Sequence, residues 1–251
     1  MKHITPFGIL ATIMVTILIS FIVIIGCSTN NKTASKAERL ASIERIKQER
    51  DSLDKVEKEK QYAADMTEVD ALKHKIDSIK TKYCKVDTDK YSGRTYIHSK
   101  NEPKYVNSRN YVGTYLSMDS NDYNSDATLF LYIDYVGSDW IFWETAYILF
   151  DNENSTNVGV KSYDKNTDVY YGGVCESASI SLGSLDFMNS GYDNNRLDIA
   201  QSIIDSKTIS VKITGQYYKI MPCKIEDFKP ICEIYFMMNK IRLIEAKYNE
   251  D

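Results

Sequence analysis

The hydrophobic pattern of the chain opens with an uncharged, mostly apolar run at residues 6–26, which Lys2 and His3 precede. A helix that crosses a bilayer needs about 20 apolar residues, whereas the apolar part of a secretory signal peptide usually has about 7–15. The length of the run therefore favours an uncleaved membrane anchor over a cleaved signal peptide. A buried core helix is a further alternative.

The next segment, residues 28–86, has the pattern of a charged helical stalk. From residue 34 to residue 83 it contains no Pro and no Gly, and it is dense in Lys, Glu and Arg, which are good helix formers. If this segment is helical throughout, roughly 50 residues at about 1.5 Å each span about 75 Å. A spacer of that length would hold a head away from a membrane surface.

Apolar residues are sparse in the stalk and form two stripes. The first comprises Leu40, Ile43, Ile46, Leu53 and Val56, and the second comprises Val69, Leu72, Ile76, Ile79 and Tyr83. The second stripe steps by three and four residues, which is the spacing of a coiled-coil seam, but for only about two heptads. A sustained coiled coil needs about three to four heptads. The pattern favours a solvated spacer and leaves weak self-association through the stalk as the alternative.

The head begins after a polar, irregular segment, residues 87–110, which contains Gly93 and Pro103 and is interpreted as a linker. Residues 111–251 carry several runs of strand length with alternating apolar and polar positions. Strands are expected at residues 111–117, 128–136, 140–151, 158–163, 169–182 and 208–220. A three-residue turn that starts at Gly137 separates the second run from the third, so these two are expected to form a hairpin.

Two segments near the C-terminus show helical spacing instead. Residues 195–206 and 225–247 repeat apolar positions every three or four residues. In the second of them Asp227 is a candidate cap, and Pro230 would lie in the first turn, where proline is tolerated. The pattern predicts an α+β fold, with a long N-terminal helical stalk followed by an antiparallel β-sheet or β-sandwich head and a C-terminal amphipathic helix.

The end of the N-terminal apolar run changes the picture of the anchor. Ile24, Ile25, Gly26 and Cys27 resemble the lipobox of bacterial lipoproteins, in which an aliphatic residue, a small or aliphatic residue and Gly or Ala precede a Cys. The resemblance implies cleavage before Cys27, lipidation of its thiol, and a mature chain tethered to the membrane of a bacterial cell envelope. Leu is the usual first residue of the motif, so Ile24 departs from it. The lipid anchor and the uncleaved anchor both place the head outside the cytoplasm.

The order of the head elements resembles the β-rich heads of bacterial lipoproteins. There a strand with Trp is followed by an acidic turn, and a late strand carries Gly-x-Tyr-Tyr, here Gly215, Gln216, Tyr217 and Tyr218. This likeness implies no particular activity. The chain has 19 tyrosines, and a tyrosine-rich surface favours binding because the ring adds contact area at low entropic cost. The net charge of −4 gives no basic footprint for nucleic acid.

Motifs that would identify an enzyme or a metal protein are absent from the sequence. The three histidines, His3, His74 and His98, fall in the anchor, the stalk and the linker, so the head has no histidine for a catalytic triad. The Asp- and Asn-rich loop at residues 119–126 lacks the Gly and the Glu that an EF-hand loop needs at its sixth and twelfth positions. The cysteine spacing fits no common zinc site. We therefore expect no metal ion and no cofactor.

Glu144 is the one catalytic candidate. It would share a strand face with Trp140 and Phe142, and a carboxylate among aromatic side chains is the environment in which a glycosidase keeps its general acid protonated. Asp134 and Glu176 also lie on expected strands. The plainer interpretation is that each of these three carboxylates faces solvent on a half-exposed sheet.

Four cysteines remain when Cys27 is set aside as the lipid site. An even number of cysteines in an exported domain permits two disulfides. Cys223 and Cys232 are close enough in sequence to pair across the start of the last helix. Buried thiols that pack as small apolar side chains are the alternative.

Together these features favour a membrane-anchored extracytoplasmic lipoprotein that acts as a binding or scaffold module of the cell envelope. Its ligand would be an envelope protein or a glycan. The alternative is a carboxylate-dependent hydrolase of envelope glycans. A signalling or immunity protein, whose head blocks an incoming effector, is a third class that no feature of the sequence selects over the first.

Overall fold

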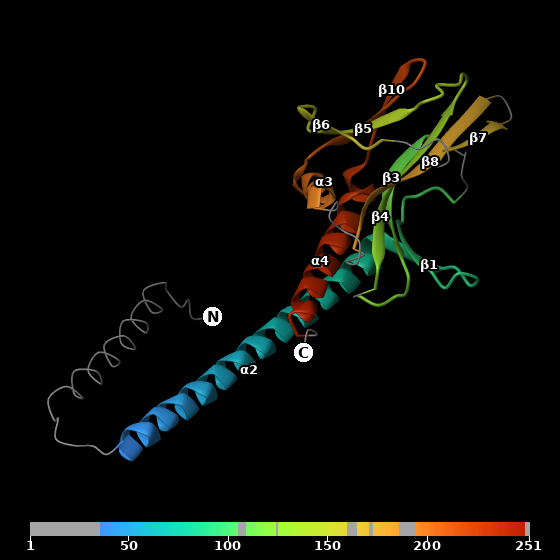
Figure 1. Ribbon diagram of the computed structural model, residues 1–251. Coiled ribbons are helices and arrows are strands. Elements are labelled where there is room, and N and C mark those ends of the chain that lie inside the picture. The colour runs from blue at the N-terminus through green and yellow to red at the C-terminus, as the bar shows by residue number, and fades with distance from the viewer. Residues whose placement is uncertain are drawn as a thin grey trace. The chain divides into compact units, whose positions relative to one another are not determined.

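The structure is a computed structural model (Figure 1), and the residues that it describes are 36–104, 109–123, 125–159, 165–170, 173–185 and 194–248. The chain divides into two compact units, Met1–Ala63 and Ala64–Asp251. The expected anchor at residues 6–26 and the lipobox at residues 24–27 lie outside the described residues. In the described part of the chain, no helix is both long enough and apolar enough to cross a membrane.

Helix α2 (Lys36–Tyr83) confirms the long helix expected from the charged segment. In the first unit the apolar stripe of this helix lies in water, with exposed fractions between 46% and 69% for Leu40, Ile43, Ile46, Leu53 and Val56. In the second unit Val69, Ile76 and Ile79 are at most 8% exposed and belong to the hydrophobic core. The coiled-coil spacing of the second stripe therefore serves packing within this chain, so those three side chains are not available to a second copy.

The second unit contains two antiparallel sheets, which agrees with the predicted α+β class. Sheet A has the strand order β1-β2-β3-β4-β8-β7, and sheet B has the order β10-β9-β5-β6. The strands of sheet A are β1 (Cys84–Thr88), β2 (Thr95–Ser99), β3 (Tyr111–Met118), β4 (Ala127–Gly137), β7 (Lys165–Tyr170) and β8 (Gly173–Ser184). Those of sheet B are β5 (Thr145–Phe150), β6 (Asn154–Asn157), β9 (Ile209–Thr214) and β10 (Tyr218–Pro222).

Helices α3 (Asn194–Asp205) and α4 (Lys229–Ala246) lie where helical spacing predicted them, and the short 3-10 helix η3 (Ile225–Asp227) precedes α4. Buried apolar residues of both sheets and of α4 belong to one core, and strands such as β5 and β9 alternate buried apolar residues with more exposed ones. Helix α4 is also tied to the α2 residues of this unit by ion pairs: Lys73 with Glu245 at 3.3 Å and Lys247 with Asp65 at 3.2 Å.

The expected linker at residues 87–110 needs correction, because it contains strand β2 and the end of β1. Strand β2 pairs with β3, and its residue Ile97 is fully buried. Thr95 and Ser99 are also buried and alternate with the half-buried Tyr96 and His98. This short alternation is a strand pattern that the surrounding polar residues obscure.

The hairpin expected on either side of Gly137 is wrong. Strand β4 pairs with β3 and β8 in sheet A, whereas β5 pairs with β6 and β9 in sheet B. The residues between Gly137 and Thr145 cross from one sheet to the other. Three backbone N–H groups of this crossing segment donate hydrogen bonds to the side chain of Glu176, which is remote in sequence. The local sequence pattern could not reveal these bonds.

Other strand boundaries also differ from the expected ones. The expected strand at 169–182 is part of a hairpin of β7 and β8, and the one at 208–220 corresponds to a hairpin of β9 and β10. The strand expected at 158–163 falls largely on residues outside the described ones, and β6 lies just before it. Each of these two expected runs contains residues of two strands.

Candidate functional site

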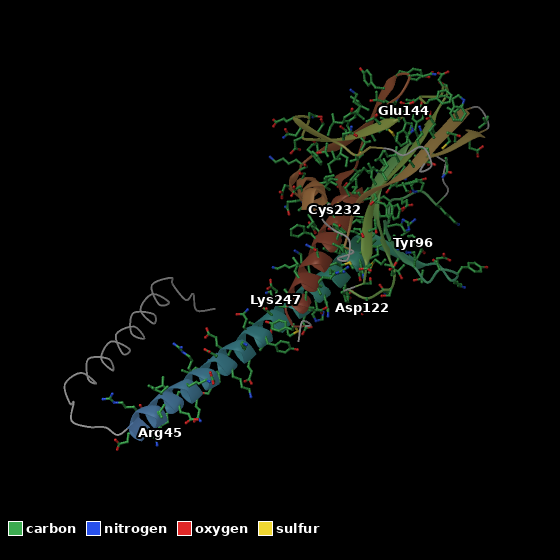
Figure 2. All side chains as sticks on the ribbon, in the orientation of Figure 1. Arg45, Tyr96, Asp122, Glu144, Cys232 and Lys247 are labelled. Carbon is green, nitrogen blue, oxygen red and sulfur yellow. The ribbon has the colours of Figure 1, made fainter. Side chains whose placement is uncertain are left out.

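Glu144, the catalytic candidate from the sequence, lies at the surface just before β5 (Figure 2). Its backbone N–H donates to the carbonyl of Thr214 on β9 at 2.9 Å, while its side chain is exposed. Its neighbour Trp143 is fully buried, and Phe142 is 48% exposed. The side chain of Glu144 lies in water rather than in an apolar pocket. This environment gives the hydrolase interpretation no support.

The carboxylate that organises this region is Glu176 on β8, which is fully buried. Its Oε1 accepts hydrogen bonds from the backbone N–H groups of Ile141 (2.6 Å) and Phe142 (3.0 Å), and its Oε2 accepts one from Trp143 (3.2 Å). Phe142 has a positive φ of 50°, in the left-handed region that non-glycine residues rarely adopt. Three charge-assisted bonds stabilise this conformation, and they fix the segment that crosses from sheet A to sheet B. The expectation that Glu176 faces solvent is wrong.

Asp134 on β4 is also buried rather than solvated. Cys175 of the neighbouring strand donates to its Oδ1 at 3.0 Å. Burial, together with this negative neighbour, raises the pKa of the Cys175 thiol to about 12. Such a thiol is a poor nucleophile at neutral pH, because the thiolate is the reactive form. The pair therefore acts as a structural contact within the sheet.

The candidate disulfide between Cys223 and Cys232 is not formed in the structure, where both residues are thiols. Cys232 is fully buried on α4 (Figure 2), and burial raises its pKa above the ordinary value. Cys223 is half-buried, and burial raises the pKa of its thiol to about 12. Both side chains pack against the core as small apolar groups, which is the alternative that the sequence left open.

The face of sheet A that points away from the core carries a ladder of rings, which we call the ring ladder: Tyr96, His98, Tyr115 and Phe130. Ring centroids lie 5.3 Å apart between His98 and Tyr115 and 4.9 Å apart between Tyr115 and Phe130, and the planes of the latter pair differ by only 9°. The sequence placed His98 in a linker, whereas it lies on β2. Its Nδ1 is 2.7 Å from Oε2 of Glu102.

The ring ladder is a poor candidate for either catalysis or glycan stacking. No described serine or cysteine is hydrogen-bonded to His98, so the histidine has no nucleophile to activate. Sugars stack on ring faces, and in this ladder His98, Tyr115 and Phe130 turn ring faces toward one another. The ladder is therefore best described as a set of cross-strand pairs that stabilise sheet A.

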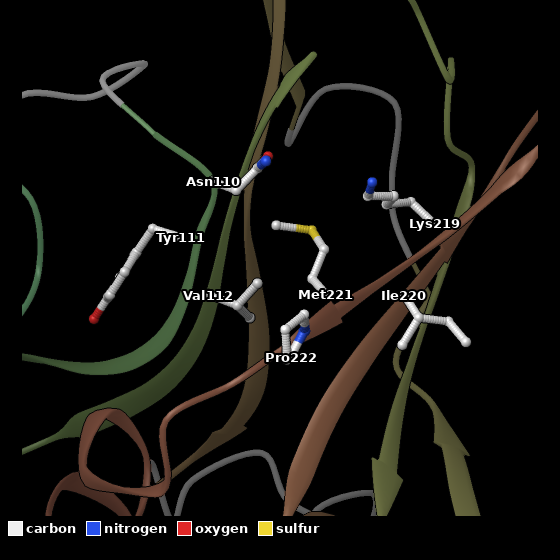
Figure 3. Close-up of a pocket in the computed structure, with 7 residues that line it drawn as sticks. All are labelled: Asn110, Tyr111, Val112, Lys219, Ile220, Met221 and Pro222. Atoms are coloured by element: carbon white, nitrogen blue, oxygen red, sulfur yellow. The ribbon is translucent and has the colours of Figure 1, made fainter.

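A cleft lies where the start of β3 approaches β10, and we call it the edge cleft (Figure 3). It consists of two adjoining hollows of about 370 Å³ and about 130 Å³. The two hollows share four lining residues: Asn110, Tyr111, Val112 and Pro222. The larger one is also lined by Lys219, Ile220 and Met221, and the smaller one by Asn101, Arg109, Lys224 and Asp227. The lining mixes apolar residues with polar ones, and we call its charged members Arg109, Lys219 and Lys224 the rim.

Asp227, expected as a helix cap, lines the smaller hollow of the edge cleft instead. It is 3% exposed and makes no capping hydrogen bond, since Phe228 occupies the N-cap position of α4. Its Oδ1 accepts hydrogen bonds from Ser99 Oγ at 2.6 Å and from Asn101 Nδ2 at 3.0 Å. These bonds join η3 to the end of β2 and position one wall of the cleft.

Tyr111 also lines the edge cleft, but its ring points away from Met221 and Lys219 (Figure 3) and lies over Gly113, where a side chain would collide with it. Burial raises the pKa of Tyr111 far above its ordinary value, and the nearby negative charges of Asp227 and Glu102 add to the effect. The hydroxyl is itself buried, so it is not offered to a ligand in the cleft.

The edge cleft is basic although the chain as a whole is acidic. Among the described residues that line it, the cations are Arg109, Lys219 and Lys224, and the only acid is Asp227. Arg109 donates to the carbonyl of Asn101 at 3.0 Å. Within the described chain, neither Lys219 nor Lys224 forms an ion pair. The rim therefore offers positive charge to a ligand.

A largely exposed aromatic patch, which we call the aromatic tip, lies at the β9–β10 turn, where Tyr218 precedes the cleft residue Lys219. It comprises Trp140, Phe142, Tyr217 and Tyr218, and the rings of Trp140 and Phe142 stack with centroids 5.5 Å apart. The Tyr217 hydroxyl donates to the carbonyl of Trp140 at 2.5 Å, which joins the turn to the crossing segment. Phe142, Tyr217 and Tyr218 are 48%, 47% and 64% exposed.

The sequence reasoning found the residues of the aromatic tip but not the edge cleft. Trp140, Phe142 and the Gly-x-Tyr-Tyr run were singled out, whereas Asn110, Arg109 and Lys224 lie in loops without a motif. Comparisons with protein families, curated proteins and solved structures gave no match. The edge cleft and the aromatic tip are therefore the candidate functional surface of the described chain.

Proposed function

We propose that this chain is a membrane-anchored extracytoplasmic lipoprotein and that its second unit is a binding module of the cell envelope. The anchor rests on the sequence, where Cys27 ends a lipobox-like motif after an apolar run. The binding role rests on one observation, the basic edge cleft that continues into the exposed aromatic tip. Aromatic residues and arginine are the types most enriched at protein interfaces.

The anchor is tested by lipid labelling in cells. Labelled palmitate is expected to enter the wild-type chain and not the Cys27→Ala variant. Cys232→Ala is the matched control, because Cys232 lies buried on α4 and offers no site for a lipid. Incorporation into Cys27→Ala at the wild-type level would rule out lipidation at Cys27 and leave the uncleaved anchor and the buried core helix as alternatives.

The binding role is tested by site-specific photocrosslinking in intact cells. A photoreactive amino acid replaces Ile220 in the edge cleft or, as the control, Tyr91 on the β1–β2 turn, which is fully exposed. A partner that crosslinks from position 220 and not from position 91 is expected. Crosslinking of that partner should fall when Lys219 is changed to Glu. The same products from both positions, or none from position 220, would contradict a binding role for the edge cleft.

A further inference from the structure

Strand β10 has a free edge along the edge cleft. It is the terminal strand of sheet B, and no described strand other than β9 pairs with it. Two hydrogen bonds fix the alternation of the pair: Gly215 N–H donates to Tyr217 C=O, and Cys223 N–H donates to Ile209 C=O. In an antiparallel pair, successive residues point their backbone groups alternately toward the partner strand and away from it.

The alternation shows which backbone groups of β10 face outward. Residues 217, 219, 221 and 223 direct their backbone groups toward β9, as the bonds at residues 217 and 223 require. Tyr218 and Ile220 therefore direct their N–H and C=O groups to the free edge, and Pro222 contributes only a carbonyl there. This edge has two complete donor and acceptor pairs, two residues apart, and ends at a proline. An unpaired edge of this kind is a template for another strand.

The walls of the edge cleft supply side-chain contacts beside this free edge. Lys219, Ile220 and Pro222 of β10 line one side, and Asn110 and Val112 at the start of β3 line the other (Figure 3). A five-residue strand such as β10 is about 17 Å long at about 3.4 Å per residue. An extended segment of similar length would run from the aromatic tip beside Tyr218 to the basic rim beside Lys224.

The positive charge of the rim indicates that an extended segment bound there would be acidic. Lys219 and Lys224 have no ion-pair partner in the described part of the chain, and Arg109 lies on the same hollow as Lys224. A fourth cation, Lys212 on β9, lies 4.9 Å from the ring centroid of Tyr218. Carboxylates placed along the segment would meet this charge, and complementary charge favours fast and specific association.

We propose that the free edge of β10 binds an extended acidic segment of a partner protein by strand addition, with its carboxylates at Lys219, Lys224 and Arg109. This inference rests on the proposed binding function and specifies its ligand. Backbone hydrogen bonds to Tyr218 and Ile220 supply affinity, and the side chains of the cleft and of the aromatic tip supply specificity. A glycan ligand would use the polar rim and not the backbone edge.

The test uses full-length protein in detergent micelles and three peptide pools that carry an uncharged dye. The first pool consists of octapeptides that alternate Val or Thr with Glu or Ser. The second has Lys in place of Glu, and the third repeats the first with methyl groups on alternate backbone nitrogens, which blocks strand pairing. Fluorescence anisotropy is expected to show at least tenfold tighter binding of the first pool than of either control pool. Equal binding of the first and third pools, or no binding of the first, overturns the inference.

Two matched pairs of variants locate the binding. Ile220→Pro removes the outward N–H without touching the bonds to β9, whereas Ile220→Val keeps it, so only the proline variant is expected to lose at least tenfold in affinity. The double change Lys219→Glu and Lys224→Glu is expected to have a similar effect. Lys90→Glu, on the exposed β1–β2 turn, is the charge control and should leave affinity unchanged.

The outcomes separate this inference from the proposed function. If charge reversal weakens binding while Ile220→Pro does not, the edge cleft binds acidic ligands without strand addition, and only the inference fails. If Ile220→Pro does not fold, hydrogen exchange of the wild-type protein decides the question. The amides of Tyr218 and Ile220 should then gain at least tenfold protection when the first pool is added. Unchanged exchange at both amides overturns the inference.

Discussion

The substitution Glu176→Gln tests how the two sheets are joined. Glutamine has nearly the same shape as glutamate but only one acceptor oxygen, so the N–H of Trp143 would face an amide NH₂ and lose its partner. An orphaned buried donor costs about 1–3 kcal/mol, and the two remaining bonds, to Ile141 and Phe142, become neutral and weaken by about 1 kcal/mol each. Relief of the cost of burying a charge offsets part of this loss. The net loss of unfolding free energy is expected to be about 2 kcal/mol.

Urea unfolding followed by tryptophan fluorescence measures this loss directly. The chain has two tryptophans, Trp140 and Trp143, and both lie in the segment that Glu176 holds. With an m-value of about 2 kcal/mol/M, a loss of about 2 kcal/mol lowers the midpoint by about 1 M. The control is Glu144→Gln, an exposed carboxylate in the same region, which should change stability by less than about 0.5 kcal/mol. A Glu176→Gln midpoint within about 0.3 M of wild type would refute the reasoning.

Three further predictions use the same unfolding assay. Gly215→Ala should lower the free energy of unfolding by about 1–3 kcal/mol, because a Cβ there would lie less than 3.0 Å from the carbonyl oxygens of Ile141 and Phe142. Gln216→Ala is the control. Equal midpoints for the two variants would contradict this close approach. Ile76→Ala should lower the free energy of unfolding by about 2–5 kcal/mol, because this side chain is fully buried. Ile46→Ala should lower it by less than about 0.5 kcal/mol, because that side chain is 60% exposed. Similar losses in the two variants would contradict the difference in environment between the two halves of α2. Burial raises the pKa of Cys84 to about 11 and that of Cys223 to about 12, from an ordinary value of 9.0. The folded state therefore keeps protons that the unfolded state releases, so the free energy of unfolding should fall as the pH rises above about 9. Cys223→Ala should reduce that fall. An unchanged pH dependence in this variant would contradict a contribution from Cys223.

The sequence by itself determined the elements whose pattern is long and regular. The uninterrupted charged run between residues 34 and 83 gave helix α2, because no glycine or proline interrupts it. Apolar residues every three or four positions gave α3 and α4, and alternation gave β4 and β9. The α+β class follows from these elements alone. Local physical chemistry suffices for them because each pattern is repeated many times within one element.

Only the tertiary structure decided which strands share a sheet and where the binding surface lies. Strands β4 and β5 looked like a hairpin, but the buried carboxylate of Glu176, on a strand remote in sequence, holds the segment between them in a sheet-to-sheet crossing. The stripe from Val69 to Ile79 looked like a coiled-coil seam, yet its apolar side chains pack into the core of their own chain.

The edge cleft has the same origin. Arg109 lies more than a hundred residues before Lys219 and Lys224, and no sequence pattern connects the three. They meet because the start of β3 and the free edge of β10 approach each other when the two sheets pack over one core. The periodicity of a segment indicates which side of that helix or strand is buried. Contacts between elements depend on which distant residues pair with their buried polar and apolar groups, and these pairings form only when the whole chain folds.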